Sequence, residues 1–333
     1  MVKSRPAAKP LVQAVTREIA RRGAYALLRI GFGPQDVDLE WAKEAPRELL
    51  RQAAPIERYA WDHVDAWMNI SAPDNTREGS DLPHERDALL GKMVRPFSAR
   101  RLAFEIPWVG CRYPTEAQAQ DAGMVLPEFE DFVFGACLLD WDAEAERMRR
   151  YKERFDAARE VRIVGAGTDL RLSLEGREGM VDDGHLNMPG GEFFFSPVED
   201  ATEGVVEFSE FPAVQMGHEC HGVRLAFDGG RVVDASARSD EEFLFSQLDA
   251  DPGARVLGEL GVGCNPSIQR HVKNTLFDEK IDGTVHLAVG AGFPFVGGKN
   301  ESIVHWDMVK DLRPGGQLYL DGELVQENGR WAI

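Results

Sequence analysis

The first half of the chain alternates helical stretches with short apolar runs. Between Leu11 and about Glu160 these runs are AYALLRI, VDAWMNI and RLAFEIPWV. The segment VQAVTREIARR predicts a helix that stops at a glycine, and GAYALLRIG then predicts a buried strand. Because helices that alternate with buried strands build βαβ units, we expect an α/β layer with a mainly parallel sheet.

The charged segment DWDAEAERMRRYKERFDAARE occupies residues 140–160. Met148, Tyr151 and Phe155 recur in it at helical spacing, which predicts an amphipathic helix with one buried stripe. We expect this helix to be the closing element of an N-terminal α/β domain, residues 1–160. Since the chain has 333 residues, a second domain is expected after it.

The remaining residues, 161–333, are expected to form a C-terminal metal-binding domain with a β-rich α+β fold. The predicted strands VRIVGAG, TDLRLSLEG, VRLAFDGGRVV and QLYLDGELV show period-two alternation. DGG at 228–230 and DG at 321–322 indicate tight hairpins. Two helical interruptions are predicted, one in SDEEFLFSQLDA and one in CNPSIQRHVKN.

Charge and cysteine content limit the classes of function. Lysine and arginine number 38 against 56 aspartates and glutamates, so the formal net charge is −18. Such a chain disfavours nucleic acid and anionic membranes as partners, and its apolar runs stay below the ~18 residues that span a bilayer. The four cysteines are scattered without a CxxC pair, which argues against a zinc cage and a disulfide framework. The basic N-terminal segment superficially resembles a targeting peptide, but its pattern of helix, stop and strand favours an ordinary folded segment of a cytoplasmic enzyme.

Three segments of the second half place potential metal ligands beside glycine or turn residues, from which loops can aim side chains into one space. They are NMPGGE at 187–192, LGELGVGCNPSI at 257–268, and the pair GTVHLAVG at 283–290 with GGKNESIVHWD at 297–307. The candidate ligands are Glu192, Glu259, His286, His305 and Asp307. Zinc, cobalt and manganese accept carboxylate and imidazole together, and this set can hold two ions if one carboxylate bridges. Two ions that activate water and polarise a carbonyl meet the requirement of amide hydrolysis.

The residue pattern alone leaves other interpretations open. A glutamate after two glycines is usually a solvated loop residue, and a single histidine in VHLAV is usually part of a core. His305 and Asp307 are two residues apart, so they would share one side of an extended strand. His218 and His221 match the spacing HxxH, which occurs in metal sites. However, residues three apart in a strand point to opposite faces, so a structural or substrate-lining role is favoured over metal binding.

Other residues and motifs offer less for chemistry. His271 in IQRHVKN is interpreted as a helix-surface histidine, and Glu279 with Lys280 as either a polar pair near the metals or a surface turn. There is no GxSxG for a nucleophilic serine, and neither GxGxxG nor a phosphate-loop GK[ST] for a nucleotide. The sequence therefore predicts no organic cofactor site.

An ordered string of motifs joins the three segments. From about Arg162 onward the chain carries NMPGGE, GRVV, LGE, NTLFDEK, GTVHLAVG and GGKNESIVHWD in this order, and IPWVGCRYPTEAQAQDAGM lies upstream. This string resembles the aminopeptidase T family of leucyl-type metalloaminopeptidases over most of the chain. The resemblance implies that the metal ligands are Glu192, Glu259, His286, His305 and Asp307.

The same resemblance implies the reaction. Two divalent ions (zinc, cobalt or manganese) would activate a water molecule that removes the N-terminal residue of a small peptide. The protons would be carried by Glu192, Glu259 or Glu279. Family members are commonly dimers, so a homodimer is expected.

One position departs from the family pattern. Seven residues after the first motif histidine the family has a tyrosine at the metal site, where this chain has Phe293. Loss of an oxyanion donor of this kind costs about 10²–10³ in rate. The runner-up function is therefore a non-heme iron ring-cleaving dioxygenase, of the 2,5-dihydroxypyridine dioxygenase type, or another diverged metal-dependent hydrolase. In the dioxygenases, which resemble this family, the position of Glu259 is a histidine. A binding protein is a third hypothesis, although acids gathered without metal would repel one another.

Overall fold

The computed structural model describes residues 1–33 and 37–332 and divides into two compact units. Unit 1 comprises Met1–Phe134 and His185–Met188, and unit 2 comprises Gly135–Gly184 and Pro189–Ile333. In the described residues, no helix is long and apolar enough to cross a membrane. The four cysteines are free thiols.

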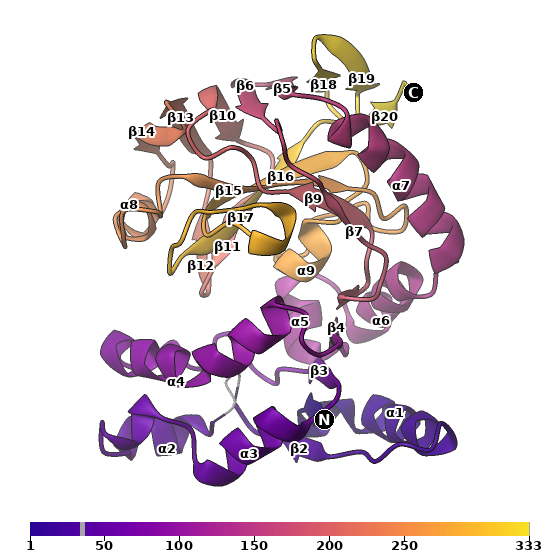
Figure 1. Cartoon of the computed structure of the whole chain (residues 1–333), viewed down its shortest axis with the longest axis vertical. Helices are drawn as coiled ribbons and strands as arrows, with labels where there is room; N and C mark the ends of the chain where they lie inside the picture. Colours follow the sequence, from indigo (N-terminus) through magenta and orange to yellow (C-terminus); the bar gives the residue numbers. More distant parts are fainter. Residues whose placement is uncertain (34–36, 333) are drawn as a thin grey trace. The chain divides into compact units, whose positions relative to one another are not determined.

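Unit 1 is built on a parallel five-stranded sheet in the order β2-β1-β3-β4-β8 (Figure 1). The strands are β1 Val2–Ser4, β2 Leu28–Ile30, β3 Trp67–Ser71, β4 Trp108–Arg112 and β8 Asn187–Met188. The helices are η1 Pro6–Ala8, α1 Lys9–Arg21, α2 Leu39–Glu44, η2 Leu49–Arg51, α3 Pro55–His63, α4 His84–Leu102 and α5 Glu116–Asp121. Helix α6, Leu126–Cys137, begins in unit 1, and its last three residues belong to unit 2. The predicted α/β layer with a mainly parallel sheet is confirmed.

The first predicted helix is found as α1, but the strand after it differs from the prediction. GAYALLRIG was expected to form a buried strand, whereas β2 is an edge strand whose Leu28 and Ile30 are 41% and 45% exposed. Within the described residues β2 pairs with β1 on one side only. An apolar run does not reveal how many neighbours a strand has, and this prediction was wrong for that reason.

Unit 2 contains two antiparallel sheets and one short two-stranded ribbon, β11-β12. The larger sheet has eight strands in the order β14-β13-β10-β6-β5-β18-β19-β20, and the smaller has five in the order β17-β16-β15-β9-β7. The larger sheet consists of β5 Glu160–Gly165, β6 Thr168–Ser173, β10 Glu203–Phe208, β13 Val223–Asp228, β14 Arg231–Ser236, β18 Gln317–Leu320, β19 Glu323–Glu327 and β20 Arg330–Trp331. The smaller sheet and the ribbon consist of β7 Met180–Asp182, β9 Glu192–Phe195, β15 Leu257–Gly263, β16 Thr284–Gly290, β17 His305–Asp311, β11 Ala213–Gln215 and β12 His218–Cys220. The helices are α7 Trp141–Asp156, α8 Glu241–Leu248, α9 Thr275–Asp278 and η3 Pro294–Val296. The predicted β-rich α+β character is confirmed.

One hydrophobic core in unit 2 contains buried residues from both large sheets. Leu170 of β6 and Val206 of β10 belong to it, together with Leu260 of β15 and Trp306 of β17. Side chains of the two sheets thus pack into a common interior, as in a β-sandwich. The smaller sheet is therefore a rigid, water-excluded support for any polar group that it carries.

The amphipathic helix predicted at residues 140–160 is α7, which Figure 1 shows beside β7 and β9. Its Met148 and Phe155 are fully buried in the core of unit 2, and the Phe155 ring lies 5.0 Å from that of Phe193. Helix α7 therefore packs as part of unit 2. A folding boundary between residues 160 and 161 stays a prediction.

The turn chemistry of the second half was predicted well. DGG joins β13 to β14 with Gly229 and Gly230 at φ of 55° and 76°, and DG joins β18 to β19 with Asp321 and Gly322 at φ of 49° and 85°. The helix expected in SDEEFLFSQLDA is α8. These signals are local, which is why the sequence shows them.

The helix expected in CNPSIQRHVKN is absent, and the segment is an irregular loop. Asp278 accepts the backbone N–H groups of Val272 and Asn274, both at 2.6 Å, so the loop bonds to a side chain in place of a helical ladder. His271 is therefore no helix-surface residue. Its Nε2 lies 3.3 Å from Oδ2 of Asp278 and its ring stacks on Phe211, while burial lowers the pKa of His271 to about 4.

Candidate metal centre

The five candidate ligands lie on four neighbouring strands of the smaller sheet. Glu192 begins β9, Glu259 lies in β15, His286 in β16, and both His305 and Asp307 in β17. These strands are adjacent in the order β17-β16-β15-β9. The expectation that loops aim these side chains was wrong. Strand pairing positions them, and His305 and Asp307 share one face of β17 as their spacing predicted.

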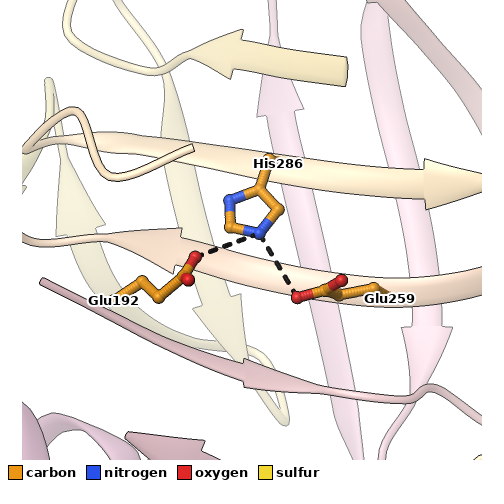
Figure 2. Close-up of side chains that lie close together, drawn as sticks. All are labelled: Glu192, Glu259 and His286. Atoms are coloured by element: carbon orange, nitrogen blue, oxygen red, sulfur yellow. Dashed lines mark hydrogen bonds and ion pairs between the residues drawn. The ribbon is translucent and has the colours of Figure 1, made fainter. Parts of the chain in front are cut away.

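Glu259 lies between two groups of potential ligand atoms. Glu192, Glu259 and His286 each offer one atom within 4.8 Å of the others, and so do Glu259, His305 and Asp307. Oε1 of Glu259 lies 3.4 Å from Nε2 of His286, and Oε2 lies 3.1 Å from Nε2 of His305. Figure 2 shows the first group, in which Nε2 of His286 faces both carboxylates. Each oxygen of Glu259 therefore faces a different imidazole.

Backbone carbonyls fix the orientation of both imidazoles. Nδ1 of His286 lies 3.0 Å from the carbonyl oxygen of Glu279, and Nδ1 of His305 lies 2.8 Å from that of Ala291. A carbonyl oxygen only accepts hydrogen bonds, so Nδ1 carries the proton in each neutral ring. The lone pair of Nε2 is then directed at the carboxylates, the arrangement that metal-ligating histidines adopt.

Glycines provide the space that the large side chains occupy. Gly261 of β15 pairs with His286 of β16, and a Cβ on Gly261 would come within 2.0 Å of Cε1 and Nε2 of the imidazole. Gly191, just before Glu192, has φ of 115°, and a Cβ there would lie 2.6 Å from Cβ of Asn265. The glycines of LGELG and PGGE are thus needed for close packing, while the ligands themselves remain in strands.

A fully buried lysine accompanies the cluster. Nζ of Lys280 lies 2.9 Å from Oε1 of Glu192 and 3.8 Å from Oδ2 of Asp182, and it also donates to the carboxylate of Glu279. Of the two interpretations of Glu279 and Lys280, the structure favours a polar pair beside the candidate ligands. No sequence signal points to Asp182, because its place in β7 becomes relevant only when β7 pairs with β9.

Burial and mutual charge shift the pKa of every member of the cluster. Burial raises the pKa of Glu192 to about 8 despite Lys280, and it raises the pKa of Asp307 to about 6 despite His305. Burial also opposes ionisation of Glu259, but hydrogen bonds with both imidazoles lower its pKa to about 2. Burial disfavours the charged imidazoles, yet the carboxylates raise the pKa of His286 and His305 to about 10. The cluster therefore attracts positive charge, as protons or as cations.

The composition of the cluster fits divalent metal. Oε2 of Glu192 and Oδ1 of Asp307 are buried and take part in no hydrogen bond among the described residues. Oε2 of Glu192 lies 3.3 Å from Nε2 of His286, and Oδ1 of Asp307 lies 3.6 Å from Nε2 of His305. Buried carboxylate oxygens normally have a partner. A mixed set of oxygen and imidazole nitrogen atoms is the donor type that zinc, cobalt and manganese accept.

Comparison with known proteins identifies the family. The family M29, described as thermophilic metalloprotease, matches residues 1–331. The chain belongs to the M29 family. The resemblance drawn from the ordered motifs is thereby confirmed.

Several relatives of the M29 protein carry aminopeptidase names. Aminopeptidase 2 of Geobacillus stearothermophilus is 34% identical over 98% of this chain and 91% of its own length. Aminopeptidase T of Thermus thermophilus is 30% identical over 97% and 90%. Aminopeptidase AmpS of Bacillus subtilis is 32% identical, but its match covers 56% of this chain and 52% of the relative, about half of each.

Two solved structures share the fold of the M29 protein. Wild-type AmpT from Thermus thermophilus superposes with a TM-score of 0.84 at 24% identity, covering 100% of this chain and 94% of that one. The 2,5-dihydroxypyridine dioxygenase from Pseudomonas putida superposes with a TM-score of 0.67 at 16% identity, covering 100% and 91%. At these identities the likeness shows only that the fold is shared. The same fold therefore occurs in proteins that are named for two different reactions.

Phe293 lies beside the cluster of the M29 protein. Its ring centroid is 4.9 Å from that of His305, and it also contacts the rings of Phe194 and Phe295 at 5.6 Å and 5.2 Å. Its backbone N–H donates to Oγ of Ser196 at 2.9 Å, which fixes the turn that carries it. An apolar aromatic wall thus stands next to His305.

The HxxH segment has other partners. His218 lies 2.7 Å from Oδ2 of Asp240 and stacks on Phe243, with ring centroids 3.9 Å apart. Among the residues that the structure describes, neither His218 nor His221 joins a candidate metal cluster. A structural or substrate-lining role for this segment stays a prediction.

Proposed function

We propose that this M29 protein is an aminopeptidase that removes the N-terminal residue of small peptides with the help of two divalent cations. The observation that carries the proposal is the position of Glu259 between two imidazoles, each of which faces a different oxygen of its carboxylate. Glu192 and His286 would complete one cation site, and His305 and Asp307 the other. The aminopeptidase names of the relatives support the choice of reaction.

The charge of the cluster favours two cations over one. The carboxylates are those of Glu192, Glu259, Asp307 and Glu279, and among the described residues Lys280 is the ammonium group that pairs with two of them. When the imidazoles are neutral, four carboxylates and one ammonium leave three negative charges. One divalent cation cannot match that charge, and buried charge left unmatched is strongly unfavourable.

The residues of the chain prepare the site for hydrolysis. When bound, the cations supply the Lewis acidity that activates water and polarises the scissile carbonyl. Lys280 holds Oε1 of Glu192, so Glu192 presents Oε2 alone toward His286. Among Glu192, Glu259 and Glu279, we assign proton transfer to Glu279, because it lies outside both ligand groups and 14% of its side chain remains exposed beside Lys280. Phe293 has no hydroxyl to share the oxyanion charge, so the reaction relies on the remaining groups.

Metal analysis combined with turnover tests the proposal. Wild-type protein is compared with Glu259→Gln, which keeps the shape of the side chain but removes its charge, and with Glu301→Gln as a matched control on an exposed loop. We expect two equivalents of zinc, cobalt or manganese and release of free amino acid from aminoacyl substrates for wild type and Glu301→Gln. Glu259→Gln should hold fewer cations and turn over at least about 10² more slowly.

Two outcomes would contradict the proposal. One equivalent of iron without amino-acid release would favour the ring-cleaving dioxygenase. Two bound cations without turnover of any aminoacyl substrate would favour a diverged hydrolase. The donor set argues against the dioxygenase, because Glu259 stands where that branch has a histidine.

Location and assembly are proposals of the same kind. The family resemblance suggests a homodimer, and the free cysteines fit a reducing cytoplasm. Light scattering on the purified protein should give twice the mass of the chain. A monomer at micromolar concentration would argue against the homodimer.

A further inference from the structure

Unit 1 contains a pocket that the proposed reaction does not use. The pocket lies among η2, α3 and α4 and has a volume of about 330 Å³, at the lower end of the range of small-molecule sites. Its lining consists of Arg51, Gln52, Ala53, Arg58, Trp61, Asp62, Lys92, Met93, Pro96, Phe97 and Arg100. The space accommodates a compact molecule and is too small for several residues of a peptide.

The floor of the pocket is apolar and rigid. Trp61, Met93 and Phe97 are 6%, 6% and 4% exposed and belong to the hydrophobic core of unit 1. The rings of Trp61 and Phe97 stack with centroids 5.2 Å apart and an interplanar angle of 11°. The floor is therefore a fixed apolar surface, of which only a small part of each ring is open to a ligand.

The rim of the pocket is cationic. Arg51, Arg58, Lys92 and Arg100 line it, and Asp62 is the one acid in the lining. Arg100 donates to the carbonyl oxygen of Trp61, and its Nε lies 3.5 Å from Glu105.

In the part of the chain that the structure describes, the other three cations of the lining have no ion-pair partner. Within residues 1–33 and 37–332, no carboxylate lies within ion-pair distance of Arg51, Arg58 or Lys92, although the chain has 56 acids against 38 bases. In so acidic a protein, a group of uncompensated cations around one cavity marks a site for negative charge.

We propose that this pocket binds a small organic phosphate. Four cations against one acid suit a doubly charged phosphoryl group better than a single carboxylate. Arg51, Arg58 and Lys92 hold the phosphoryl group, and the apolar part of the ligand rests on Trp61 and Phe97. The site is independent of the metal centre and of the proposed peptidase reaction.

Isothermal titration calorimetry of the full-length protein tests the site, with phenyl phosphate as the probe and inorganic phosphate and benzoate as comparisons. Phenyl phosphate should bind saturably and more tightly than either comparison, because it alone engages both the rim and the floor. The double variant Arg58→Ala with Lys92→Ala should weaken binding by about tenfold or more. Raising the salt from about 50 to about 500 mM should weaken it further.

Arg95→Ala serves as the control, since Arg95 is an exposed arginine of α4 outside the pocket lining. Its affinity for phenyl phosphate should equal that of wild type. The proposal is overturned if no probe binds saturably at millimolar concentration, if the double variant binds as well as wild type, or if Arg95→Ala weakens binding equally. Tighter binding of benzoate than of phenyl phosphate would overturn the phosphate assignment. Unchanged circular dichroism of both variants excludes misfolding as the cause of any loss.

Discussion

Replacing Gly261 by alanine tests whether His286 is a ligand at the position that the structure gives it. The added Cβ would lie 2.0 Å from Cε1 and Nε2 of the imidazole, the atom that faces the carboxylates. The clash cannot be relieved at the backbone, because Gly261 and His286 are paired partners in adjacent buried strands. The imidazole itself must move.

The size of that movement sets the expected effect. Ordinary contact begins at 3.4 Å, so the ring has to retreat from 2.0 Å to 3.4 Å, which is about 1.4 Å. A misplacement of about 1 Å in a catalytic site costs about 10² in rate. We therefore expect kcat/KM to fall by at least 10², or about 2.7 kcal/mol. Crowding should also lower the free energy of unfolding by about 1–3 kcal/mol.

Three measurements on Gly261→Ala check this reasoning: kcat/KM with an aminoacyl p-nitroanilide, bound metal by mass spectrometry, and urea unfolding with and without chelator. Gly91→Ala is the matched control, since a Cβ at Gly91 in α4 would meet no atom within 4 Å. If Gly261→Ala kept full metal content and an unchanged kcat/KM, His286 would not be a ligand in this geometry. Loss of stability without loss of metal would point to a purely structural glycine.

Three further substitutions separate stability from chemistry. Lys280→Met leaves Glu192 and Glu279 facing each other without a cation, so the metal-free protein should lose about 3–5 kcal/mol in urea unfolding, and kcat should fall as well. Lys310→Met removes another buried lysine, whose Nζ donates to the carbonyls of Ala166 and Glu207 and to Glu210, and it should lower stability similarly while bound metal stays at the wild-type level. Phe293→Tyr places a hydroxyl near His305 and should raise kcat, by up to about 10² if it reaches the oxyanion. An unchanged kcat would show that this position has no part in the chemistry.

The sequence predicted those parts of the fold that depend on near neighbours. The run VDAWMNI contains most of β3, the run RLAFEIPWV ends with the first two residues of β4, and the glycine turns of both hairpins were located. Helix α7 was found because Met148 and Phe155 recur at helical spacing. Each of these signals is contained within a few residues of chain.

The failures concern contacts between distant residues. The exposure of β2 follows from its pairing, among the described residues, with β1 alone. The loop at 264–274 depends on Asp278, which accepts two of its backbone N–H groups. The position of Lys280 beside Glu192 likewise appears only when distant segments are paired in space. Spacing nominated the ligands and placed His305 and Asp307 on one face of a strand, but only the order of the family motifs joined the set. Neither revealed that strand pairing also positions Glu192 and Glu259.

The location of the ligands in paired strands has a consequence for how the family can vary in length. Side chains alternate faces along a strand, so one inserted or deleted residue within β9, β15, β16 or β17 would turn every ligand beyond it to the other face. The connections between these strands carry no such restriction. The alignment with the Thermus thermophilus relative spans 378 positions, more than the 333 residues of this chain, and therefore contains gaps. We expect those gaps to fall in the connections between the strands. The connections would then differ in length among relatives, while the spacing of the ligands within each strand stays constant.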